Sequence, residues 1–169
     1  VAHGATGHNG GQLVSYFERP FHDIVKEFGL HLAAKAQDEI ISAWELLEEI
    51  SREAKLQTPI TQFTGYAGCK SLEQLLPHLE NKWWRSQASI KFDSIYVAKE
   101  AEFLNKIPEK YKDLYAIISQ KEILDLLETN NKEYLVALSS RKGCMNSALF
   151  CEELAGYMLQ TYPDRFKLI

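Results

Sequence analysis

The 169-residue chain has no long apolar run, few cysteines and little net charge. No stretch approaches the roughly 18 consecutive apolar residues that a membrane-spanning helix needs, and no signal peptide is visible. The three cysteines, Cys69, Cys144 and Cys151, form no Cys-x-x-Cys pair, which argues against a disulfide-rich secreted scaffold and against a structural zinc site. We therefore expect a cytoplasmic protein with reduced thiols, no membrane contact and no bound metal.

Basic residues are outnumbered, because 19 Lys and Arg against 23 Asp and Glu leave a formal net charge of −4. A protein that binds nucleic acid through a broad basic surface is thereby excluded. The balance is uneven, however, since residues 70–112 hold eight basic and six acidic side chains. A local contact with nucleic acid in that region stays open. The content of 46% hydrophobic and 25% charged residues is typical of an ordinary folded domain.

The longest regular pattern lies between Phe21 and about Lys55. Apolar residues recur there at steps of three and four, which keeps one face of a helix apolar over roughly nine turns. The members of this face are Ile24, Phe28, Leu32, Ala36, Ile40, Trp44, Leu47, Ile50 and Ala54. Because such a face must be covered by later segments, we predict an all-α fold. It would be an irregular multi-helix bundle built on one long helix at 21–55, with little or no sheet.

Two serines have the spacing of a helix start. Ser71 precedes Gln74 by three residues and Ser119 precedes Glu122 by three, which is the capping-box arrangement. Each pair predicts a helix that begins just after its serine. Pro77 follows the first of these starts, and we expect the helix to break there because proline lacks the backbone N–H.

Three other segments carry weaker signals. Residues 56–69 break the helical period, and we interpret them as a packed loop. A helix starting near Asp93 fits the following pattern, although the stretch IKFDSIYV is also compatible with a short strand. We expect a further helix from Tyr134 that ends within Ser139–Cys144, with Gly143 as its stop.

The N-terminal segment is rich in glycine. Gly4, Gly7 and Gly10 form a G-x-x-G-x-x-G pattern that is similar to the phosphate-binding turn of atypical short-chain dehydrogenases. That resemblance implies a small protein that binds a nucleotide or NAD(P) through these glycines. The strand that should precede such a turn has no room before Gly4, so we favour a flexible arm at residues 1–12 and predict no cofactor.

The hexapeptide KWWRSQ is the most unusual short stretch. Trp83 and Trp84 lie between Lys82 and Arg85, so the indole rings could stack on bases while the cations hold phosphates. The basic pair Arg141 and Lys142 is a second candidate for phosphate contact. The alternative is that the tryptophans pack against the core. Adjacent helical side chains point about 100° apart, so both tryptophans cannot be buried in one core.

Two pieces of the chain together resemble a known family. The tail GYMLQTYPDRFKL is similar to the first strand of the nicking domain in gene A-type replication initiators of temperate tailed phages, and the Trp83-Trp84-Arg85 run is similar to a paired tryptophan upstream in that family. The matching tail residues are Tyr157, Thr161, Pro163, Arg165 and Phe166. The family ends this motif with a histidine where the chain has Lys167. No catalytic residue can be carried over.

These observations lead to one principal expectation and two alternatives. We expect residues 13–169 to form a single helical domain, part of a larger protein, which acts as a non-catalytic module that binds DNA or a replication-type protein partner. The first alternative is the nucleotide- or NAD(P)-binding protein, and the second is a structural subunit that associates with a protein partner or with itself.

Overall fold

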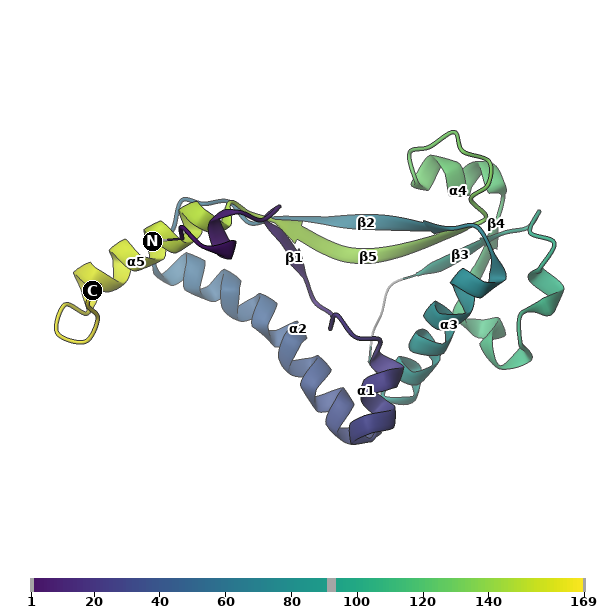
Figure 1. Cartoon of the computed structure of the whole chain (residues 1–169), viewed down its shortest axis with the longest axis horizontal. Helices are drawn as coiled ribbons and strands as arrows, with labels where there is room; N and C mark the ends of the chain where they lie inside the picture. The colour runs from purple at the N-terminus through teal and green to yellow at the C-terminus, as the bar shows by residue number, and fades with distance from the viewer. Residues whose placement is uncertain (1, 91–93, 169) are drawn as a thin grey trace. The chain divides into compact units, whose positions relative to one another are not determined.

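The computed structural model describes residues 2–90 and 94–168, and within them the chain forms helices and a five-stranded sheet (Figure 1). The α-helices are α1 (Phe21–Phe28), α2 (Leu30–Glu53), α3 (Leu72–Gln87), α4 (Gln120–Leu126) and α5 (Ser147–Thr161). Short 3-10 helices lie at η1 (Ala5–Gly7), η2 (Leu104–Lys106) and η3 (Glu109–Leu114). The strands are β1 (Gln12–Val14), β2 (Thr61–Cys69), β3 (Ile95–Ala98), β4 (Ala116–Ile118) and β5 (Val136–Cys144).

The prediction of an all-α helical bundle is wrong, because the chain has a mixed α/β fold. The sheet is built around β5, which is antiparallel to β1 and to β3 and also pairs with β2. In the first pairing Leu13 lies opposite Gly143, and in the second Val97 lies opposite Val136. In the strand order β1-β5-β3-β4, the last two strands, β3 and β4, are parallel to each other.

Two of the strands occupy segments that we expected to be loop and helix. Strand β2 covers most of the stretch interpreted as a packed loop, and β5 covers the expected helix from Tyr134 onward. Arg141 and Lys142 therefore lie in a strand and not at a helix C-terminus. Both errors have the same physical cause, since a strand gains its hydrogen bonds from partners far away in the chain and local periodicity does not report them.

The stretch IKFDSIYV contains β3, which confirms the strand alternative for its second half. Residues 91–93 lie outside the described part of the chain, and the helix start expected near Asp93 falls there. At the other two predicted helix starts the caps are present. Ser71 accepts a hydrogen bond from the backbone of Gln74, and Ser119 and Glu122 form the complete capping box of α4.

The long helix expected at 21–55 is divided at Gly29, which has φ +81°. Only α2 continues as a long helix, and the division changes which side chains are covered. Phe28 and Leu32 are 53% and 57% exposed, whereas Ala33 and Gln37 are 1% and 2% exposed. The expectation that the whole apolar face is covered is therefore wrong at its N-terminal end, because the covered positions lie one residue further along the helix.

Residue contacts divide the chain into two compact units. The first unit comprises the described parts of Val1–Ser15, Ile40–Phe63 and Lys142–Ile169, and the second those of Tyr16–Glu39 and Thr64–Arg141. In the first unit, Trp44 is 4% exposed and packs so closely over Gly143 that a Cβ on this glycine would lie 2.7 Å from Cη2 of the indole. No Cβ fits there, which explains why a glycine faces this tryptophan.

The core of the second unit forms between α3 and one side of the sheet. Its buried members are Cys69, Leu75, Leu79, Ile95, Val97, Ala101, Ile107, Tyr111 and Val136. Helix α3 runs through Pro77 without the break that we expected. A smaller buried cluster of Ala98, Ile123 and Ala137 joins α4 to the central strands.

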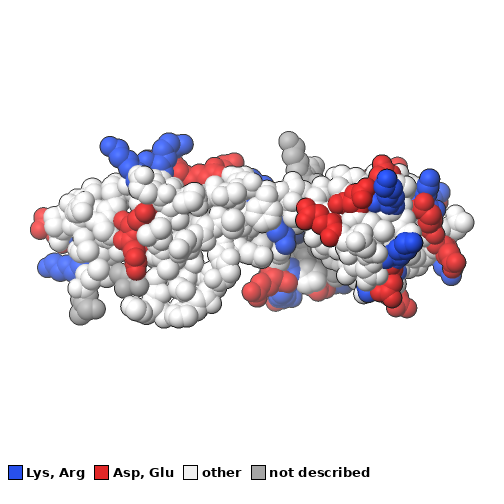
Figure 2. Space-filling model, turned by 90° about the horizontal axis from the view of Figure 1, so that it is seen from above, with Lys and Arg blue, Asp and Glu red and all other residues white. Residues whose placement is uncertain are grey.

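Neither the helices nor the visible charges indicate a membrane or a broad basic surface. Among the described residues, no helix combines the length with the apolar character that a bilayer crossing requires. Figure 2 shows acidic and basic side chains interspersed on the face that it presents, without a continuous basic area.

Candidate functional site

A hollow lies at the bend between α1 and α2, in the second unit. Pro20 precedes α1, and Gly29 ends it by donating its N–H to the carbonyl of Val25 at 2.8 Å. The positive φ of Gly29 then turns the chain into α2, which brings side chains from both helices around one space. We call this space the elbow hollow. It has a volume of about 590 Å³ and is lined by Phe17, Glu18, Arg19, Ile24, Phe28, Leu32, Ala33 and Ala36.

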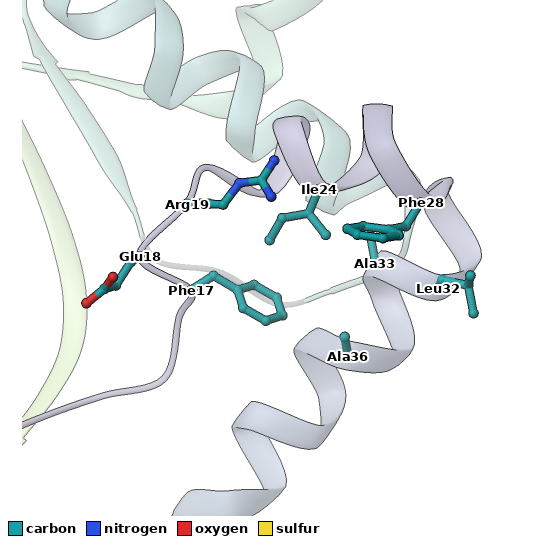
Figure 3. Close-up of a pocket in the computed structure, with 8 residues that line it drawn as sticks. All are labelled: Phe17, Glu18, Arg19, Ile24, Phe28, Leu32, Ala33 and Ala36. Carbon is teal, nitrogen blue, oxygen red and sulfur yellow. The ribbon is translucent and has the colours of Figure 1, made fainter.

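The walls of the elbow hollow are apolar and its floor is made of small residues. Figure 3 shows Phe17, Ile24 and Phe28 arranged around the space, with Ala33 and Ala36 below them on α2 and Glu18 directed away. Ala33 is buried, whereas the short side chain of the half-buried Ala36 leaves room above it for a large group from outside. Large apolar side chains that remain exposed around such a space are typical of binding surfaces.

Arg19, one of the two charged residues that line the elbow hollow, forms an ion pair. Nη2 of Arg19 lies 2.8 Å from Oε2 of Glu27, which is on α1. The stretch from Tyr16 to Glu39 contains five acidic and three basic residues, so its net charge is negative. A ligand with basic groups beside its apolar ones would match this surface.

The predicted nucleic-acid residues on α3 are drawn into the second unit. Trp83 packs against the main core, and the Nζ of Lys110 lies 5.3 Å from the centre of the Trp83 ring. Trp84 stands edge-on to Trp83, with ring centroids 4.9 Å apart. The guanidinium of Arg85 donates to Oε1 of Gln37 at 3.4 Å and lies 5.7 Å from the ring centre of Phe21.

These contacts determine how accessible residues 82–85 are to a nucleic acid. Lys82 and both tryptophans are half-buried, and Arg85 reaches toward α1 and α2 and not outward. Stacking of bases requires an open ring face, and Trp83 has one side against the core. The packing alternative therefore accounts for Trp83 and Arg85, while contact with DNA stays a prediction.

The second predicted pair is divided between the two units. Arg141 is exposed and belongs to the second unit, whereas Lys142 is half-buried and belongs to the first, where it lies opposite Val14 in the sheet. Their adjacency on a strand places the two side chains on opposite faces of the sheet. Contact of this pair with a phosphate stays a prediction.

The glycine-rich segment forms turns that are held by hydrogen bonds. The carbonyl of Gly4 accepts from the N–H of Gly7 at 3.0 Å, and the hydroxyl of Ser147 at the start of α5 donates to the carbonyl of Thr6 at 2.6 Å. Strand β1 follows the glycines and is antiparallel to β5. A dinucleotide turn leads into a helix, whereas these glycines lead into β1, so this arrangement does not fit one.

Sequence reasoning did not identify the elbow hollow. Phe28, Leu32 and Ala36 belong to the face of the long helix that the sequence predicts to be covered. A signal for the site is nevertheless present in the sequence. Pro20 and Gly29 enclose a helix of eight residues, which predicts a bend at Gly29, and the small residues Ala33 and Ala36 follow just beyond it.

Comparisons with protein-family models, with curated proteins and with solved structures give no match for this chain.

Proposed function

We propose that this chain is a non-catalytic module that binds another protein, and that the elbow hollow receives apolar side chains from an amphipathic helix of that partner. The observation that carries the proposal is the exposure of Phe28 and Leu32, which are 53% and 57% accessible beside a floor of alanines. Leaving two large apolar side chains in water on neighbouring helices has a cost that a partner removes when it covers them.

The shape of the hollow favours a helix as the occupant. Ala36 on α2 is half-buried and has a short side chain, so a partner helix can approach α2 closely at this residue and insert a large side chain. The acidic balance of Tyr16–Glu39 favours basic residues next to the inserted ones. The partner segment is therefore expected to be a basic amphipathic helix.

A synthetic peptide tests the proposal directly. The probe is a fluorescein-labelled helix of about 18 residues, or five turns, with leucine at one face and lysine elsewhere. We expect its fluorescence anisotropy to rise on titration with the protein. A scrambled peptide of the same composition, and a version with glutamate in place of lysine, should bind at least about tenfold more weakly.

A matched pair of variants locates the binding. Ala36→Leu fills the elbow hollow and should weaken binding by about tenfold or more, whereas Ala43→Leu makes the same change at an exposed position of α2. The proposal is wrong if the scrambled peptide binds equally well, or if the two variants bind the helix alike.

Binding of DNA in place of a protein is the other possible outcome of this experiment. A gel-shift series with single- and double-stranded oligonucleotides at two salt concentrations accompanies the peptide titration. A shift that weakens steeply with salt and is lost in Trp84→Ala, together with no binding of the helical peptide, would replace the protein partner with DNA.

A further inference from the structure

Strand β2 forms an edge of the sheet. Among the described strands it pairs only with β5, and the carbonyl of its last residue, Cys69, accepts a hydrogen bond from the N–H of Leu135 at 3.0 Å. Backbone groups alternate between the two sides of a strand, so every second residue counted from Cys69 faces β5. The backbone groups of Thr64, Tyr66 and Gly68 therefore face away from β5.

This edge lacks three of the features that normally prevent two strands from pairing, namely charged residues, proline and short length. Such edges are protected by lysine or other charges, by proline, by bulges or by short length. Strand β2 has the sequence TQFTGYAGC, which contains no charged residue and no proline over nine residues. By contrast, β4 at another edge is three residues long.

The side chains of β2 are also open to solvent. Phe63 is 44% exposed and Tyr66 is 37% exposed, and Thr64 and Ala67 are exposed as well. The two aromatic rings point to opposite faces of the strand because their positions differ by an odd number. Both faces therefore offer apolar surface to a neighbouring strand.

When two copies of β2 are placed antiparallel to each other about Gly65, their side chains are complementary in size. In an antiparallel pair centred there, Phe63 lies opposite Ala67 of the second copy and Tyr66 lies opposite Thr64, so that each aromatic side chain meets a smaller one. No like charges face one another. Lys70, which follows the strand, is at opposite ends in the two copies.

We propose that two copies of this chain associate through β2, as antiparallel strands related by a two-fold axis at Gly65. The outward backbone groups of Thr64 in one copy then exchange hydrogen bonds with those of Tyr66 in the other, which is the pairing that this register requires. The interface is isologous, because the same strand serves both copies. A second copy fits better than an unrelated peptide because the complementarity lies within the strand itself.

The mass of the protein in solution tests the association. Light scattering is measured over a concentration series of about 1 to 200 µM, since a dimer must dissociate on dilution. We expect the mass to approach twice the 19.3 kDa of one chain at the upper end. Thr64→Lys introduces a charge at the open edge and should shift the mass to that of a single chain. Thr161→Lys makes the same change at an exposed position outside β2 and should leave the dimer intact.

A disulfide test defines the register and does not depend on Thr64. All variants carry Cys144→Ser, which removes the exposed native thiol. Phe63→Cys combined with Ala67→Cys should give a covalent dimer under mild oxidation, because each new thiol faces its counterpart across the axis. Phe63→Cys alone should not, since position 63 is then about 13 Å along the strand from its equivalent.

Three results would overturn the proposal: the mass of one chain at every concentration, an unchanged dimer in Thr64→Lys, or equal cross-linking by the single and double cysteine variants. Added unlabelled helical peptide should leave the dimer unaffected. This separates the β2 contact from the elbow hollow, so either proposal can fail alone.

Discussion

At the scale of single residues, the Glu153 carboxylate joins α5 to the segment that follows α2. Its Oε2 accepts hydrogen bonds from the backbone N–H of Gln57 at 2.9 Å, and from both the backbone N–H and the hydroxyl of Thr58 at 3.0 Å. Thr58 is 2% exposed, so its donors would have no access to water if the carboxylate were removed. This one side chain therefore satisfies a buried turn.

These hydrogen bonds, led by that from the Thr58 backbone, hold the pKa of Glu153 below its ordinary value of 4.5. The folded protein binds a proton here less readily than the unfolded chain. The stabilisation is therefore complete above pH 4.5 and is lost as the pH falls through the lowered pKa.

We predict that Glu153→Gln flattens the pH dependence of the melting temperature in the acid range, because the group that titrates there is gone. Thermal unfolding followed by circular dichroism from neutral to acid pH measures this. Glu152→Gln is the control, since that side chain is exposed on the same helix. Identical pH profiles for both variants and the wild type would contradict the assignment.

Two glycines provide a second residue-scale prediction with opposite signs. A Cβ on Gly143 would lie 2.7 Å and 2.9 Å from atoms of the Trp44 ring and 3.0 Å from the carbonyl oxygen of Thr61. Gly143→Ala should therefore lower the free energy of unfolding by about 1–3 kcal/mol. Gly156 is in α5 with nothing within 4 Å of its Cβ position, so Gly156→Ala should raise it by about 0.5–1 kcal/mol. Urea unfolding compares the two, and equal effects would be inconsistent with this packing.

At the scale of elements, Gly29 decides that one amphipathic pattern becomes two helices. Its φ of +81° and ψ of +158° lie in a region that residues with a Cβ rarely occupy. The bend creates the elbow hollow, since Ile24 and Phe28 come from one side of it and Ala33 and Ala36 from the other. A straight helix would place these side chains along one line.

We predict that Gly29→Ala costs about 1–3 kcal/mol of unfolding free energy, because alanine must adopt the strained dihedrals or force α1 and α2 into one helix. Urea denaturation measures the cost, and binding of the helical peptide should weaken in parallel. Gly10→Ala is the control, since its φ is ordinary and nothing lies within 4 Å of its Cβ position. A variant of unchanged stability and unchanged peptide binding would show that the bend does not depend on glycine.

At the scale of the whole molecule, charge and exposed apolar surface agree with the proposed protein partner. The net charge is −4, and on the face in Figure 2 the basic side chains are mixed with acidic ones. Counterion release from DNA requires several cations on one surface. Exposed apolar side chains instead occur at Phe28 and Leu32 of the elbow hollow and at Phe63 and Tyr66 of β2, where burial by a protein is favourable.

The sequence by itself determined the local signals of this chain, which are the helix starts after Ser71 and Ser119. Each depends on a few neighbouring residues, so a short stretch contains the whole cause. Only the tertiary structure decided that β2 and β5 are strands, that Trp83 and Arg85 point inward and that Phe28 stays exposed. These features depend on partners that are distant in the chain, so the residues next to them in the sequence do not predict them.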